Sequence, residues 1–114
     1  MIHSAKAWVF QVHAEILPSP KSQMAADYAN EPIAGAFVNI YVPANSLEEA
    51  IDIAKAALAK NEYRLIGLEW VIKLEFEEWE IEEGEPSLSQ LEELLNSNDY
   101  LFGRFYVYGS SDAH

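Results

Sequence analysis

One segment constrains the fold of this chain more than any other: residues 64–85, RLIGLEWVIKLEFEEWEIEEGE. Apolar and polar side chains alternate along its first half, and a period of two is typical of a half-buried β-strand. The alternation predicts a core face of Ile66, Leu68, Trp70, Ile72, Leu74 and Phe76 and an opposite face of Glu69, Lys73, Glu75 and Glu77. The apolar series then moves to odd numbers at Trp79 and Ile81, which predicts a bulge at Glu77 and Glu78.

The length of this segment is a second constraint. About 16 residues at ~3.3 Å each would span roughly 50 Å, whereas a folded chain of this size has a radius of gyration of about 13–14 Å. The strand must therefore bend or project beyond its sheet. Its outer half either curls at the bulge or reaches a neighbouring subunit, with Trp79 and Ile81 as anchors. Its dense glutamates also suit an edge strand protected from indiscriminate pairing.

Residue patterns, helix-capping motifs and chain-breaking residues predict five further elements, three strands and two helices. Residues 5–17 and 36–42 alternate as strands whose even-numbered side chains face the core, and 103–108 is rich in β-forming residues. Capping boxes at Ser46–Glu49 and Ser87–Gln90 predict helices to about Lys60 and Leu95. Residues 18–35, which begin with two prolines, read as a long loop, and 109–114 as a flexible tail.

The order strand, strand, helix, strand, helix, strand predicts one α+β domain over residues 1–114. We expect a two-layer sandwich, with a four-stranded, mostly antiparallel sheet and both helices on one face. This resembles the ferredoxin-like group in architecture only. A true ferredoxin-like order needs a hairpin turn within 64–83, and no Gly, Pro, Asn or Asp lies near Glu77 and Glu78 to form one.

Charge and composition exclude several classes of function. Seven basic and nineteen acidic residues give a net charge of −12, which repels nucleic acids and anionic membranes and permits a basic protein partner. The absence of cysteine excludes disulfides and thiolate chemistry. There is no run of eighteen uncharged apolar residues and no leader pattern at the start, so we expect a soluble cytoplasmic protein.

The sheet face turned away from the helices is the candidate binding surface. It is predicted to mix aromatic and ionisable side chains, and soluble monomers seldom expose a broad aromatic patch. A covering partner, a second copy or an enclosed ligand would explain it, while wet tyrosine hydroxyls on a solvated face are the plain alternative. The predicted partner-binding residues are Tyr41, Glu75, Glu77, Trp79, Glu80, Ile81, Tyr106 and Tyr108.

Few residues suggest catalysis or metal binding. The weak catalytic candidates are His13, Glu15, Glu69 and Arg104, because a histidine held by a carboxylate can act as a general base near neutral pH. Zinc needs three or four ligands, and no calcium loop, phosphate loop or nucleophile motif is present. We therefore predict no metal site and no cofactor.

These observations favour a non-enzymatic protein that works by protein–protein association. It would form a homodimer, neutralise a basic partner, or do both, as an inhibitor or immunity protein does. The alternative is a small-molecule-binding protein or small enzyme that uses the mixed polar and aromatic sheet face around His13. A structural accessory with no site of its own is a third interpretation.

Overall fold

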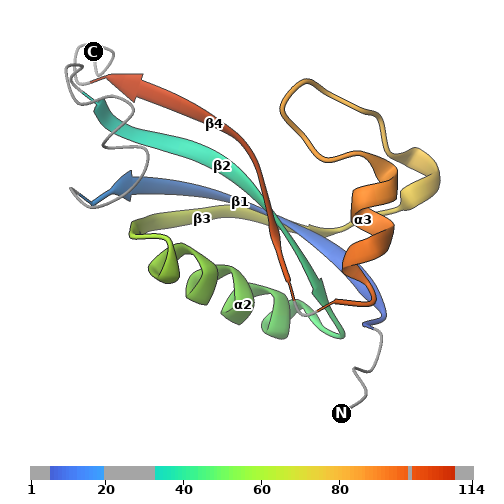
Figure 1. Ribbon diagram of the computed structural model, residues 1–114. Coiled ribbons are helices and arrows are strands. Elements are labelled where there is room, and N and C mark those ends of the chain that lie inside the picture. The colour runs from blue at the N-terminus through green and yellow to red at the C-terminus, as the bar shows by residue number, and fades with distance from the viewer. Residues whose placement is uncertain (1–5, 20–32, 98, 110–114) are drawn as a thin grey trace.

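The computed structural model describes residues 6–19, 33–97 and 99–109. Four strands form one sheet in the order β3-β1-β2-β4, and every neighbouring pair is antiparallel. The elements are β1 (Trp8–Pro18), β2 (Ile33–Ala44), α2 (Leu47–Lys60), β3 (Tyr63–Lys73), a 3-10 turn (Phe76–Glu78), α3 (Leu88–Leu94) and β4 (Leu101–Gly109) (Figure 1). The predicted α+β arrangement with a four-stranded sheet and two helices is confirmed.

Helix α2 covers the face formed by the even-numbered residues of β1 and β2. This core joins Phe10, Val12, Ala14 and Ile16 of β1 and Ala36, Val38, Ile40, Val42 and Ala44 of β2 to Ala50, Ala54 and Leu58 of α2. The alanines let the helix backbone approach the sheet closely, because they carry no side chain beyond Cβ. The predicted alternation of β1 and β2 is confirmed. Leu47, the first residue of the helix, is 48% exposed and lies outside this core.

Helix α3 packs on the opposite face of the sheet. Its buried Leu91 and Leu94 contact Val9 and Tyr41, whose odd numbers place them on the side away from α2. Figure 1 shows the two helices on either side of the strands. The expectation that both helices lie on one face is therefore wrong: α2 covers the predicted face, and α3 covers part of the opposite one. The physical reason is the apolar pair Val9 and Tyr41, which gives α3 a surface to cover at one end of the second face.

Strand β3 is shorter and more irregular than its pattern predicts. Its register against β1 shifts twice, so that Ile66 and Glu69 are extra residues without a direct partner. Each extra residue reverses the facing of those beyond it, and Leu65, Leu68 and Val71 contact the core. Three residues predicted on the core face are instead exposed to solvent: Ile66 by 52%, Trp70 by 41% and Ile72 by 46%.

The strand ends at Lys73, and this resolves the problem of its length. A 3-10 turn stands where a bulge was expected at Glu77 and Glu78. The chain leaves the sheet there and returns to α3 through residues 74–87, seen above the end of the sheet in Figure 1. Leu74 and Phe76 still pack inward, against the α3 cluster rather than against α2.

Both predicted helix starts carry a serine cap. At α3 the box is complete, since the Gln90 amide donates to the Ser87 hydroxyl over 3.2 Å and the Ser87 amide donates to Gln90 Oε1 over 2.8 Å. At α2 the Glu49 amide donates to Ser46 Oγ over 3.1 Å.

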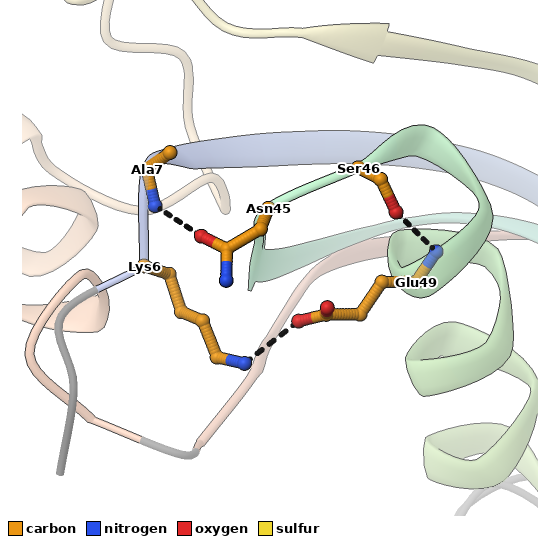
Figure 2. A network of polar contacts seen from close by, with 5 residues as sticks. All are labelled: Lys6, Ala7, Asn45, Ser46 and Glu49. Atoms are coloured by element: carbon orange, nitrogen blue, oxygen red, sulfur yellow. Dashed lines mark hydrogen bonds and ion pairs between the residues drawn. The ribbon is translucent and has the colours of Figure 1, made fainter.

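At α2 the second half of the box is replaced by an ion pair. The Glu49 carboxylate pairs with Lys6 Nζ at 2.7 Å instead of returning to its own cap (Figure 2). The Ala7 amide also donates to Asn45 Oδ1 over 2.8 Å. These contacts fasten the start of β1 to the start of α2.

Two predicted segments lie mainly outside the described residues: the loop at 18–35, of which 20–32 are not described, and the tail at 109–114, of which 110–114 are not described. Within the described ranges, neither helix has the length and hydropathy that a membrane span requires.

Candidate functional site

The candidate site is the part of the second sheet face that lies beyond α3, here called the open face. Cross-strand pairing brings its side chains together, because directly paired residues point to the same side of a sheet. No described helix covers it beyond the end held by Val9 and Tyr41. The open face consists of Gln11, His13, Glu15, Phe37, Asn39, Trp70, Ile72, Tyr106 and Tyr108.

A row of rings crosses the open face, with one ring from each strand in sheet order. Trp70 of β3 stacks on His13 of β1, with ring centroids 4.9 Å apart and planes inclined by 9°. The other side of His13 stacks on Phe37 of β2 at 5.7 Å and 4°, and Phe37 meets Tyr108 of β4 at 5.6 Å and 38°. His13 is thus held between two nearly parallel rings, which fixes its plane.

A polar chain fixes which nitrogen of His13 carries a proton. Nδ1 of His13 lies 2.7 Å from Oδ1 of Asn39, and Nδ2 of Asn39 donates to Oε1 of Glu85 over 3.0 Å. Because only the amide nitrogen can donate to a carboxylate, the amide oxygen must face the histidine and accept from it. Nδ1 is therefore the protonated nitrogen, and Nε2, which no described residue hydrogen-bonds, is an acceptor when the ring is neutral.

Glu85 is the centre of the polar chain. Besides Asn39, its carboxylate accepts from the Tyr41 hydroxyl over 2.6 Å and from the Arg104 amide over 2.7 Å. Gln11 Nε2 donates in turn to the Tyr41 hydroxyl over 3.0 Å. Burial, and then the adjacent Glu85 carboxylate, raise the pKa of Tyr41 well above its ordinary value, since both oppose a second negative charge.

Gly103 makes room for this carboxylate. A Cβ at position 103 would lie 2.7 Å from Cδ of Glu85, far inside van der Waals contact. The absence of a side chain at position 103 of β4 therefore allows residues 74–87 to dock onto the sheet through Glu85.

A second carboxylate on the open face is held separately. The Tyr108 hydroxyl donates to Oε2 of Glu15, and this hydrogen bond is the first cause of the raised pKa of Tyr108. The Tyr108 ring lies over Gly35, where a Cβ would come within 2.7 Å of Cζ. Glu15 is consequently engaged at the β4 edge and does not hold His13.

A cavity of about 320 Å³ opens between the open face and residues 74–85. Gln11, Asn39 and Tyr41 form its floor, and Ile72 and Trp79 contribute apolar walls. Its lining carries one ammonium group, that of Lys73, and five carboxylates, those of Glu75, Glu78, Glu80, Glu82 and Glu85. In the described part of the chain, no three His, Asp or Glu side chains are placed to hold a metal ion.

The predicted catalytic residues do not form one cluster. His13 and Glu15 share a face but have different partners, Asn39 and Tyr108. Glu69 is an extra residue of the bulged strand, and Trp70 takes the place opposite His13. The Arg104 guanidinium carbon lies 5.3 Å from the Tyr106 ring centroid, while its backbone amide binds Glu85.

The predicted partner-binding residues differ in exposure. Tyr41 is fully buried, and only its hydroxyl group serves the site. Trp79 packs on its own chain, edge-on to Tyr41 at 5.7 Å, and its Nε1 donates to the Pro86 carbonyl over 3.1 Å, so it does not project as an arm. Ile81 is 72% exposed. Glu75, Glu77, Glu80 and Tyr106 are exposed as well, and Tyr108 is half-buried.

Sequence reasoning missed three residues that organise the site. The alternation places Trp70 in the core because it gives no sign of the bulges at Ile66 and Glu69. Asn39 was placed on the correct face without a role. No sequence signal indicates a role for Glu85, and only the proximity of its carboxylate to Tyr41, 44 residues away in the chain, gives it a function in the fold.

Comparisons with protein-family models, with curated proteins and with solved structures find no match to this chain. Any functional interpretation therefore depends on the geometry of the open face and its cavity.

Proposed function

We propose that the protein acts by binding another protein through its open face. The observation that carries this proposal is the exposure of Trp70 and Ile72, 41% and 46%. Trp70 is the β3 end of the row of rings, which no described helix covers. Exposed aromatic and aliphatic side chains that are contiguous commonly mark protein interfaces, and tryptophan is prominent among residues that dominate binding energy.

Charge favours a basic partner over a second copy. The chain carries a net charge of −12, and exposed glutamates of residues 75–83 lie beside the open face. Two copies would bring like charges together, whereas a basic protein would be attracted to the face and steered toward it. Neutralisation of such a partner, as by an inhibitor or immunity protein, is the form of activity that size and charge support.

A photo-crosslinking amino acid in place of Trp70 tests the proposal in cells of the source organism. The matched control carries the same amino acid in place of Leu47, which is 48% exposed at the start of α2. Position 70 should give one main adduct whose second component is a basic protein, and position 47 should give none. Mass spectrometry of the adduct identifies the component.

Two results would contradict the proposal. Equal adducts at both positions would show that exposure alone determines crosslinking. An adduct containing a second copy of the chain, together with a dimeric mass by light scattering at high salt, would replace the basic partner with a homodimer.

The geometry of His13 favours a second candidate, binding or turnover of a small molecule. A fixed ring plane and a defined tautomer present Nε2 as a hydrogen-bond acceptor or base. Under this alternative, a ligand found by NMR screening should lose affinity in His13→Phe, a variant that keeps an aromatic ring in the row. Retained affinity, or an obligate interface that covers His13, would exclude it.

A further inference from the structure

The cavity beside the open face has the properties of a site for a single organic cation. Its volume, about 320 Å³, is at the lower end of the range for small-molecule pockets. It is too large to fit a bare metal ion, and the described residues offer no group of three metal ligands. A side-chain-sized group fits these dimensions.

The floor of the cavity is rigid before any ligand arrives. Tyr41, which is fully buried, donates its hydroxyl proton to Glu85, and Gln11 and Asn39 each commit an amide proton within the protein. Several of the donors are thus already engaged, while the carboxylate oxygens of the rim remain as acceptors. This balance favours a ligand that donates hydrogen bonds.

The walls provide apolar and aromatic contacts independently of charge. Ile72, two residues beyond Trp70 in β3, lies on one side of the cavity. The half-buried Trp79 ring lies on another side, held by its hydrogen bond to the Pro86 carbonyl. An aromatic ring in a cavity wall attracts a cation through its π face, and the isoleucine suits an aliphatic stem.

Charge selects the sign of the ligand. Five carboxylates line the cavity against one ammonium group, that of Lys73. Lys73 Nζ lies 4.9 Å from the Trp8 ring centroid and 3.8 Å from Oε1 of Glu75, so it offsets at most one of the five carboxylates. Arginine fits best among protein cations, because its planar fork of five donors can reach several carboxylates at once and its plane stacks on aromatic rings.

We infer that this cavity receives an arginine side chain of the basic partner while neighbouring residues of that partner lie on Trp70 and Ile72. The inference rests on the proposed function and names the chemistry of the contact. The arginine would enter beside Ile72, since that residue is exposed on the open face next to the partner and also forms part of the cavity wall.

Titration with N-acetyl-arginine amide, followed by NMR at the Trp79 indole N–H, tests the cavity without any protein partner. The expected result is a saturable shift with a Kd on the order of 1 mM, and binding at least about tenfold weaker for the uncharged isostere N-acetyl-citrulline amide. The absence of a saturable shift, or equal binding of both amides, would overturn the inference.

A pair of double variants separates the site from bulk charge. Glu80→Gln with Glu82→Gln removes two rim carboxylates and should weaken arginine-amide binding severalfold. Glu48→Gln with Asp52→Asn removes the same charge from exposed positions on α2 and should leave it nearly unchanged. Equal weakening by both pairs would contradict a specific site.

Failure of the proposed function gives a different pattern. Trp70→Ala should leave arginine-amide binding intact, because Trp70 does not line the cavity. If the amide binds as described but crosslinking at position 70 finds no basic protein, the cavity is a cation site and the open face is not the interface. If crosslinking succeeds but the amide does not bind, only the inference about the cavity fails.

Discussion

Asn39 of β2 and Glu85 of the segment 74–87 are 46 residues apart in the chain and form a hydrogen bond, in which the Asn39 amide nitrogen lies 3.0 Å from Oε1 of Glu85. This one hydrogen bond connects two parts of the site. On one side it orients the amide that fixes the His13 tautomer, and on the other it joins the sheet to the segment that encloses the cavity. The open face and the cavity should therefore respond together when Glu85 is changed.

Replacing Glu85 by Gln should loosen both parts at once. The uncharged amide is a weaker acceptor for Tyr41, Asn39 and the Arg104 amide, and it can turn an NH₂ group toward one of them. We expect the free energy of unfolding to fall by about 1–3 kcal/mol, measured by urea denaturation. Amide hydrogen exchange in residues 74–87 should accelerate more than in β1.

Glu83→Gln is the matched control for this change. Glu83 is exposed and lies two residues earlier in the same segment, so it loses the same charge without losing a described partner. Its stability should stay within about 0.5 kcal/mol of the parent protein. Equal losses in both variants would show that net charge, rather than the Glu85 contacts, controls stability.

The Asn39→Asp variant should show a pH-dependent loss of stability. A carboxylate at position 39 cannot donate to Glu85, and the two negative charges would repel each other. This repulsion requires both carboxylates to be ionised, so the loss of stability is largest at neutral pH and decreases as the carboxylates become protonated at lower pH.

Urea denaturation of both proteins across the acidic range measures this difference. Asn96→Asp, at an exposed position just after α3, is the control and should show no such trend. A deficit in Asn39→Asp that is constant with pH would contradict the contact between positions 39 and 85.

Two glycines provide a steric test of how Glu85 docks. Gly103→Ala introduces a Cβ that would lie 2.7 Å from Cδ of Glu85, which must then move away from the sheet. The free energy of unfolding should decrease by about 1–3 kcal/mol. Gly67→Ala meets nothing within 4 Å and should be neutral, or stabilising by up to about 1 kcal/mol.

Thermal or urea unfolding of the two glycine variants gives the comparison directly. The two changes are chemically identical and both lie in strands, so strand propensity contributes similarly to each. A Gly103→Ala variant as stable as Gly67→Ala would mean that Glu85 does not occupy the position described.

Local pattern was sufficient to predict the class of the fold and much of its core. Alternation in β1 and β2, and the serine caps of both helices, depend on neighbouring residues and can be read from the chain. The facing of Trp70 cannot, because two bulges in β3 depend on how that strand pairs with β1. A one-residue shift reverses every side chain beyond it, and no local signal marks the shift.

The site was harder to predict than the fold for the same reason. His13 and the tyrosines of the open face were recognised as candidates, but their partners come from distant segments. Glu85 reaches Tyr41 only because α3 covers the second face and draws residues 74–87 over it. The placement of α3 depends on the apolar pair Val9 and Tyr41, which pattern alone assigned to an exposed surface.

The raised pKa of Tyr41 predicts a specific loss of stability in alkali. Burial and then Glu85 keep the folded tyrosine protonated, so its folded pKa exceeds the unfolded value of 10.0. The corresponding stability is fully present below pH 10 and is lost as pH rises above it, because only the unfolded chain then releases the proton. Unfolding above pH 10 should therefore release nearly one proton from this residue alone.

Tyr41→Phe isolates this contribution. The variant loses the hydrogen bond to Glu85 and should be less stable than the parent at neutral pH, by about 1–2 kcal/mol. Above pH 10 the parent should lose stability faster than the variant, so the two curves converge as pH rises. Urea denaturation followed by fluorescence, with tyrosinate absorbance recorded in parallel, measures both effects. Curves that stay parallel through the alkaline range would show that Tyr41 ionises as readily in the folded chain as in the unfolded one, and the buried contact with Glu85 would then be refuted.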